Sequence, residues 1–184
     1  MVTEDERRQL LAIARDAIAF SLGKLALPRT APLAGSLAGP GGAFVTIRLH
    51  GELRGCIGYI ESPMPLANVV AEVAVKSARQ DPRFPPLSPD ELEECTLEVS
   101  VLSPLRKVVD EKEIRIGVHG LLLESRGRRG LLLPQVAVEN SWDVPEFLRN
   151  TCRKAGLHDG AWKDPGATLF LFTAEVASEE HAHT

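Results

Sequence analysis

The residues best suited to chemistry lie in one short stretch, residues 53–58, with the sequence LRGCIG. We name it the signature stretch. Side chains alternate along a strand, so Arg54, Cys56 and Gly58 would share one face. A nearby cation lowers the pKa of a thiol, and the thiolate is its reactive form. Glycine inside a strand often marks a close approach by a ligand. We therefore expect an open face at Cys56, with Gly55 and Gly58 as substrate contacts.

A cysteine nucleophile also needs a base or an orienting partner, and His119 is the natural choice. It lies between Gly117 and Gly120, where the backbone can bend sharply and present the imidazole. Gln135 and Glu139, which follow an apolar stretch, could donate or accept hydrogen bonds from a substrate. These residues suggest thiol chemistry with Cys56 and Arg54 as partners and His119 as the base.

Arg83 is a further candidate, because it stands on a stiff connector, residues 81–86, with the sequence DPRFPP. Proline fixes its own φ and restricts the residue before it. An arginine and a phenylalanine displayed on such a turn could bind an anionic or planar ligand, and they could equally brace the turn against the core. Cys56 likewise has a plainer interpretation as a small buried hydrophobe. The alternative for His119 is a turn histidine bonded to backbone.

The amino-acid composition of the chain argues against several classes of function. The 184 residues carry a net charge of −4, which argues against bulk electrostatic binding of nucleic acid. Three widely spaced cysteines without a Cys-x-x-Cys pair suit a reducing cytosol, so we expect a cytoplasmic protein. No apolar run approaches the ~20 residues that cross a bilayer, so we expect no membrane association. The histidines are scattered, and we predict no metal site and no cofactor.

The elements that must position these residues follow from local patterns. Thr3 and Glu6 form a capping box before an amphipathic helix that Gly23 ends. A tight turn at His50-Gly51-Glu52 predicts a hairpin that holds the signature stretch in its second arm. Further patterns predict helices after Ser62, Ser88 and Pro145, strands over 96–103 and 168–176, and a second hairpin over 121–134.

These elements predict an α+β fold. We expect an antiparallel sheet of about six strands with three main helices packed mostly on one face, with room for a small second lobe. The chain reads as a single domain over 1–184. Its parts are an N-terminal helix over 1–25, a loop over 26–42, a main body over 43–177 and a flexible tail over 178–184.

The signature stretch resembles the hexapeptide typical of the AMMECR domain family, known in prokaryotes as AmmeMemoRadiSam system protein A. Other segments are similar to family segments and occur in family order: Phe44–Ile47, Asp81–Phe84, Leu97–Ser100, His119–Leu121, Gly130–Val136 and Ala161–Pro165. The resemblance implies the same α+β class. It brings Arg54, Cys56, His119 and Gln135 forward as site residues, with less weight on Glu139.

The resemblance also implies a function. It favours a cysteine-dependent enzyme that modifies a nucleotide or an RNA base together with a Memo-type protein and a radical-SAM enzyme. The rival is a non-catalytic binding or scaffolding module that presents a substrate to those partners. In that case Cys56 is packing, and the gap at Gly55 and Gly58 is a docking groove.

A basic turn, residues 125–130 with the sequence SRGRRG, joins the arms of the second hairpin. Arg126, Arg128 and Arg129 are most simply a solvated turn. Three arginines at one tip can also act as an anion site, so a phosphate contact is the sharper alternative.

Overall fold

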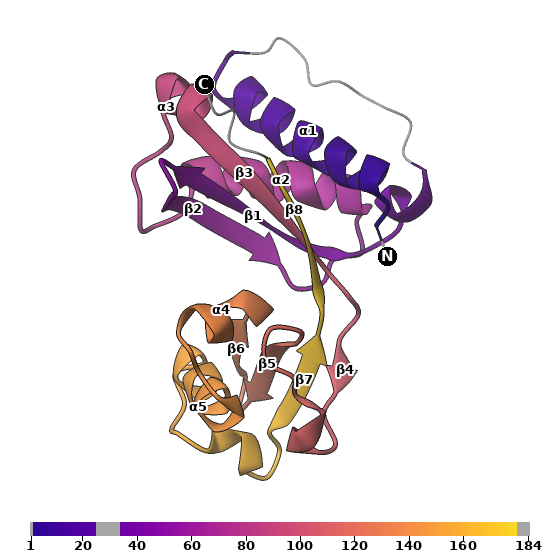
Figure 1. Cartoon of the computed structure of the whole chain (residues 1–184), viewed down its shortest axis with the longest axis vertical. Coiled ribbons are helices and arrows are strands. Elements are labelled where there is room, and N and C mark those ends of the chain that lie inside the picture. Colours follow the sequence, from indigo (N-terminus) through magenta and orange to yellow (C-terminus); the bar gives the residue numbers. More distant parts are fainter. Residues whose placement is uncertain (1, 25–33, 180–184) are drawn as a thin grey trace. The chain divides into compact units, whose positions relative to one another are not determined.

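The computed structural model describes residues 2–24 and 34–179 (Figure 1). The chain divides into two compact units. Unit 1 comprises Met1–Leu102 with Glu175–Thr184, and unit 2 comprises Ser103–Ala174. Residues 26–33 of the expected loop and residues 180–184 of the expected tail lie outside the described residues.

Unit 1 begins with helix α1, Glu4–Ser21, and the predicted capping box is present. The backbone N–H of Glu6 donates to Thr3 Oγ1 at 3.2 Å, and the N–H of Thr3 donates to Glu6 Oε2 at 2.8 Å. The unit also contains helix α2, Leu66–Arg79, helix α3, Pro89–Glu94, and a 3₁₀ turn, Gly35–Ala38. Pro89 occupies the first turn of α3, where the missing N–H does not matter.

The sheet of unit 1 has the strand order β2-β1-β3-β8. Its strands are β1, Gly42–Leu49, β2, Glu52–Tyr59, β3, Cys95–Leu102, and β8, Ala174–Ser178. The first two form the predicted hairpin, whose turn places His50 and Gly51 at φ 51° and 85°. Strand β2 is therefore an edge strand, and it carries the signature stretch.

Helices α1 and α2 lie over one face of this sheet (Figure 1). The core between them consists of aliphatic side chains with no solvent exposure, among them Leu10, Ile18, Val45, Ile47, Val70, Val73, Leu97 and Val99. Burying each such side chain contributes about 1.5–3 kcal/mol. This packing fixes α2 against the strand that holds the signature stretch.

Unit 2 has its own sheet, in the order β4-β7-β5-β6. Its elements, in chain order, are β4, Arg106–Lys107, a 3₁₀ turn, Glu111–Glu113, β5, Gly120–Ser125, β6, Arg128–Leu132, α4, Pro134–Glu139, α5, Val144–Lys154, a 3₁₀ turn, Ala161–Lys163, and β7, Thr168–Phe172. Helix α5 packs against β5 and β6, and its buried Phe147 and Leu148 join the core with Leu121 and Leu123. A Cβ at Gly130 would lie 2.4 Å from the backbone nitrogen of Ala155, so glycine permits this approach.

The α+β class is confirmed, but the strands form two four-stranded sheets instead of one sheet of about six. The expected strand over 168–176 is the reason. It is interrupted at Thr173, and its two halves, β7 and β8, pair in different sheets. Thr173 is held there by Ser103, whose backbone N–H donates to Thr173 O at 2.9 Å and whose hydroxyl accepts from Thr173 N at 2.9 Å.

The first residues of the expected flexible tail are part of unit 1. Ser178 ends β8, and the backbone N–H of Glu179 donates to Leu97 O at 3.0 Å. The Glu179 carboxylate also accepts from Arg15 Nε at 2.6 Å. This pair joins the end of β8 to α1, so Glu179 is held within unit 1.

Candidate functional site

The backbone of Cys56 is held by the connector that follows α2. An edge strand leaves alternate N–H and C=O groups without a strand partner. On β2 the Cys56 N–H donates to Asp81 Oδ2 at 2.9 Å, and the Cys56 carbonyl accepts from Arg83 Nη2 at 3.3 Å. We call Thr46, Cys56, Asp81 and Arg83 the Cys56 corner. The connector thus serves as the missing strand neighbour at this position.

Asp81 and Arg83 form the charged part of the Cys56 corner. The Arg83 guanidinium donates to Asp81 through Nε at 2.9 Å and through Nη2 at 2.7 Å, and the Arg83 backbone N–H donates to the same carboxylate at 3.1 Å. Asp81 is only 4% exposed. The Arg83 hydrogen bonds, aided by the Cys56 N–H, hold the Asp81 pKa well below its ordinary value although burial opposes them. The pair is therefore ionised and rigid.

The Cys56 thiol is half-buried, and the Thr46 hydroxyl donates to its Sγ at 3.3 Å. Burial raises the thiol pKa above its usual value of 9.0, and this effect exceeds the lowering by Thr46 and by the Arg83 charge. Desolvation thus disfavours the expected charge-stabilised thiolate, and a catalytic role for Cys56 stays a prediction.

Arg54 does not supply the cation beside the thiol. Its guanidinium is largely buried on α3, where Nε donates to Glu91 Oε1 at 2.8 Å and Nη2 donates to Glu91 Oε2 at 3.0 Å. A third hydrogen bond runs from Nη1 to Pro85 O at 2.9 Å. These contacts lower the Glu91 pKa to about 2. Arg54 therefore links β2 to α3. The position near Cys56 that was predicted for the Arg54 guanidinium is occupied by Arg83.

The glycines of the signature stretch do not border an open space. A Cβ at Gly55 would lie 2.3 Å from the backbone oxygen of Ser77 in α2, and a Cβ at Gly58 would lie 2.3 Å from the ring of Phe44. The expected gap is therefore filled by the protein itself. Gly55 allows α2 to approach β2, and Gly58 makes room for an aromatic side chain on β1.

Ser77, in α2, bridges the two strands of the hairpin, β1 and β2. Its hydroxyl accepts from the Ile57 N–H at 2.8 Å and donates to Val45 O at 2.8 Å. The side chain is buried, so both bonds are made away from water. The close approach at Gly55 is what brings this helix position within reach of the strands.

The other predicted site residues belong to unit 2. His119 Nδ1 accepts from the Arg115 backbone N–H at 3.1 Å, which matches the turn-histidine alternative. Burial, aided by the Arg106 charge, lowers its pKa. Gln135 is half-buried in α4, and Glu139 ends that helix exposed to solvent. The pairing of His119 with Cys56 spans the two units and stays a prediction.

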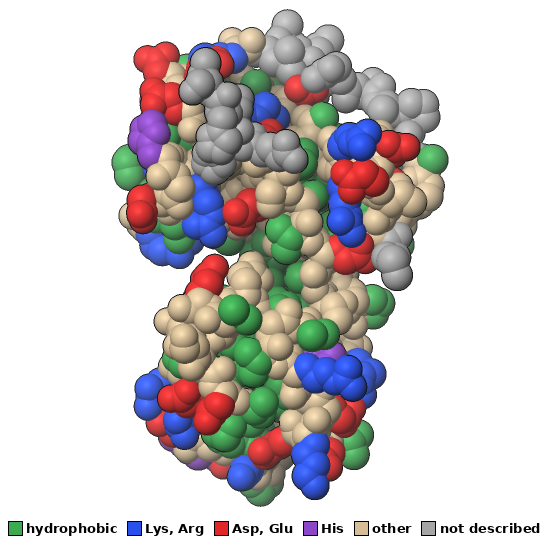
Figure 2. Space-filling model, in the orientation of Figure 1, with side chains coloured by type: hydrophobic (Ala, Val, Ile, Leu, Met, Phe, Trp, Pro, Cys, Tyr) green, Lys and Arg blue, Asp and Glu red, His purple; other side chains and the backbone are tan. Residues whose placement is uncertain are grey.

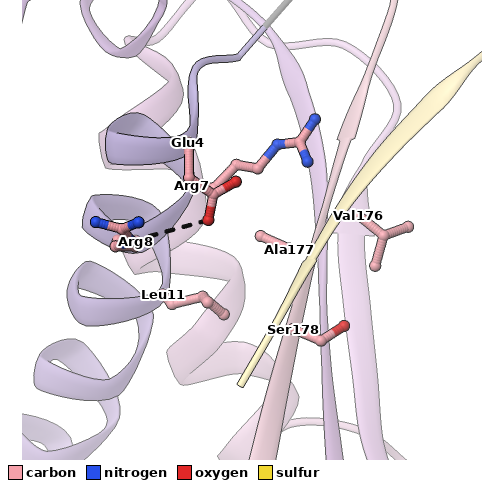
Figure 3. A pocket seen from close by; sticks show the side chains of 7 residues that line it. All are labelled: Glu4, Arg7, Arg8, Leu11, Val176, Ala177 and Ser178. Atoms are coloured by element: carbon pink, nitrogen blue, oxygen red, sulfur yellow. Dashed lines mark ion pairs between the residues drawn. The ribbon is translucent and has the colours of Figure 1, made fainter. Parts of the chain in front are cut away.

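One cavity in unit 1 contains none of the predicted site residues. It has a volume of about 510 Å³ and lies between α1 and β8 (Figure 3). Leu11 and Ala177 face each other across it, and Glu4 and Arg8 form an ion pair at 3.8 Å on the helix side. The residues are far apart in sequence, so no local motif could have indicated this hollow.

Among residues 2–24 and 34–179, no group of three or more His, Cys, Asp or Glu side chains could hold a metal ion. Within the same residues, no helix has the length and apolar character needed to span a membrane. The residues that sequence reasoning missed are Thr46, Ser77 and Asp81. Thr46 and Asp81 had a signal, because each lies in a segment that resembles the family, 44–47 and 81–84, whereas Ser77 lies in none of these segments.

The chain is similar to a protein family, to proteins of archaea and to a solved structure. A family model described as AMMECR1 matches residues 11–177. A protein of Methanothermobacter thermautotrophicus is 44% identical over 97% of both chains, and protein MK0488 of Methanopyrus kandleri is 42% identical over 97% of this chain and 91% of its own. The crystal structure of uncharacterized protein PH0010 from Pyrococcus horikoshii has a TM-score of 0.88 at 37% identity, covering 97% of this chain and 94% of that one.

Proposed function

Because this chain belongs to the AMMECR1 family, we propose that it is a non-catalytic binding module that presents a substrate to a Memo-type protein and a radical-SAM enzyme. One observation carries the proposal. The signature stretch uses its guanidinium, its glycines and its cysteine backbone for contacts inside unit 1. The stretch therefore acts as a scaffold for the connector, and the side chain that the connector displays is Arg83.

The state of Cys56 supports binding over catalysis. A thiol with a pKa above about 9 is less than about 1% ionised at pH 7, and the thiolate is the nucleophile. Burial raises the Cys56 pKa, and this effect exceeds the lowering by the Thr46 hydroxyl, which donates to the sulfur. The enzyme hypothesis needs the opposite environment, a thiol whose charged form is favoured.

Arg83 and Phe84 provide the binding surface in this proposal. The Arg83 side chain is 52% exposed although Asp81 fixes its guanidinium, and its Cζ lies 5.4 Å from the centroid of the Phe84 ring. A cation and a ring held in one place lose little conformational entropy when a ligand binds. Such a surface suits the anionic and planar groups of a nucleotide or an RNA base, the substrate class that the resemblance implies.

The thiol is tested first by alkylation of the folded wild-type protein. Iodoacetamide is added at pH values from 6 to 11, and modification of each cysteine peptide is quantified by mass spectrometry. We expect Cys56 to react more slowly than a free thiol at pH 8, with a midpoint above 9. Rapid modification with a midpoint below 7 would overturn the proposal and restore the thiol enzyme.

Binding is tested by capture of the two partners from cells. Cys56→Ser should capture both partners as well as wild type does and should support the same cellular activity. Arg83→Gln should capture about tenfold less. Arg106→Gln is the matched control, since that guanidinium is 56% exposed and also paired with a carboxylate, Glu113. Loss of cellular activity in a folded Cys56→Ser variant that still captures its partners would refute the non-catalytic role.

A further inference from the structure

The turn between β5 and β6 gathers positive charge around a hollow in unit 2. A cavity of about 310 Å³ is lined there by Arg126, Arg128 and Arg129 and by a single acidic residue, Glu124. The register pairs Ser125 with Arg128 and Glu124 with Arg129, so two residues, Arg126 and Gly127, form the turn. Both have positive φ, 53° and 74°, which makes the turn tight and brings the arginines together.

The three guanidinium groups differ in how firmly they are held. Arg128 donates to the carbonyl of Gly156 after α5, and this contact anchors the turn to the helix. Arg129 pairs with Glu124 on the same face of the hairpin. Within the part of the chain that the structure describes, Arg126 has only a loose pair, Nη2 to Asp164 Oδ2 at 3.7 Å, and its side chain is 72% exposed. Arg126 is thus the guanidinium with most capacity for another anion.

Ser125 provides a second, independent indication of a ligand. It lines the same cavity and is only 4% exposed. Its hydroxyl has no hydrogen-bond partner among the residues that the structure describes. A buried hydroxyl without a partner costs free energy, and most buried polar groups are satisfied. A ligand oxygen that accepts from Ser125 would remove this cost.

The size of the charged area limits the class of ligand. On the face drawn in Figure 2, basic side chains are interspersed with acidic ones and form no broad basic surface over the described residues. The net charge of the chain is −4. Extended nucleic acid is bound through many phosphate contacts, whereas three arginines on one turn match a single phosphate group.

We propose that the β5–β6 turn is a binding site for one phosphate group of a small ligand. Arg126 and Arg129 make the charge-assisted hydrogen bonds, Arg128 holds the turn on α5, and Ser125 donates its hydroxyl. The site lies in unit 2, whereas the Cys56 corner belongs to unit 1. This proposal does not rest on the function proposed above.

The test is a titration of the isotopically labelled protein with inorganic pyrophosphate, followed through its backbone amide NMR signals. We expect saturable shifts centred on residues 125–129. The variant Arg126→Gln with Arg129→Gln should bind about tenfold more weakly, as expected for the loss of charge-assisted hydrogen bonds. Arg126→Gln alone, at the most exposed position, should show a smaller loss in a fold that is unchanged.

Arg8→Gln is the matched control. Arg8 is 71% exposed, pairs loosely with Glu4 at 3.8 Å and borders another cavity, so the substitution removes the same charge from a similar setting. It should leave pyrophosphate affinity unchanged. Shifts that never saturate, or equal losses in Arg8→Gln, would overturn the site. Binding of single-stranded oligonucleotides that strengthens steeply with length, without saturation by adenosine monophosphate, would overturn the single-phosphate assignment in favour of RNA.

Discussion

The carboxylate of Asp81 should be the most sensitive single group in unit 1. It accepts four hydrogen bonds, from the Cys56 N–H and from the backbone N–H, Nε and Nη2 of Arg83. Asp81→Asn keeps the shape but leaves one acceptor oxygen and turns the other atom into a donor. That donor would face N–H groups that donate to the carboxylate in the wild-type protein.

The size of the effect follows from the contacts. A hydrogen bond to a charged group contributes about 1.5–3 kcal/mol, and neighbouring bonds are not additive. Arg83 is half exposed and regains water, whereas the Cys56 N–H and the altered Asp81 side chain stay within the fold. We expect the variant to lose about 2–4 kcal/mol, a large share of the roughly 5–15 kcal/mol that stabilises a typical domain.

Urea unfolding at pH 7, followed by circular dichroism, measures this loss. With a slope of about 2 kcal/mol per molar urea, the middle of the usual range, the midpoint should fall by about 1–2 M. Asp90→Asn is the control, because Asp90 is exposed on α3 and the chemical change is the same. An Asp81→Asn midpoint within about 0.3 M of wild type would refute the assignment of Asp81 as the anchor of the corner.

Acid provides a second measurement of Asp81. Its folded-state pKa lies below its ordinary value of 3.8, so its contribution to stability is complete above that pH. The contribution is lost as the pH falls through the folded-state pKa, because protonation then weakens the native contacts. The difference in unfolding free energy between wild type and Asp81→Asn should therefore shrink below about pH 4. A difference that stays constant down to pH 2 would contradict this origin.

Three further predictions concern contacts of the signature stretch. Gly55→Ala should cost about 1–3 kcal/mol in urea unfolding because its Cβ meets backbone, whereas Gly39→Ala, with only an ordinary contact at 3.8 Å, should be near neutral. Ser77→Ala removes the hydroxyl between β1 and β2, so it should cost about 1–3 kcal/mol and speed amide exchange at the hairpin. Glu91→Gln should destabilise at pH 7 through its Arg54 pair, and the difference should vanish as pH falls from 4.5 to about 2.

The parts of the fold that the sequence predicts are those set by local contacts. The capping box at Thr3 and Glu6 and the turn at His50 and Gly51 involve residues within a few positions of each other. The interruption at Thr173 could not be predicted in this way. Thr173 is bonded there to Ser103, which lies 70 positions earlier, so no local pattern indicates the contact.

The same distinction applies to the candidate site. Cys56, Arg54 and the two glycines were selected by residue type, and their surroundings depend on partners 22 or more positions away, apart from the hairpin neighbours. A glycine reserved for a ligand and a glycine reserved for a helix look identical in sequence. The contact with Ser77 separates the two at Gly55. Arg83 was selected for its display on a stiff connector, and its side chain is 52% exposed there, while its role as a binding residue stays a prediction.

Contacts between the signature stretch and the connector that carries Arg83 explain how a sequence inside the fold could serve a binding module. Asp81 receives the Cys56 N–H and fixes Arg83, so one carboxylate links the edge strand to the exposed guanidinium. Mutating Asp81 should therefore change stability and ligand affinity together, whereas mutating Arg83 removes mainly the group that meets the ligand. A guanidinium fixed before binding saves the entropy that a free arginine would lose. On the function proposed above, the strand sequence would thus act on affinity through the position of Arg83, with no atom of the signature stretch contacting the ligand.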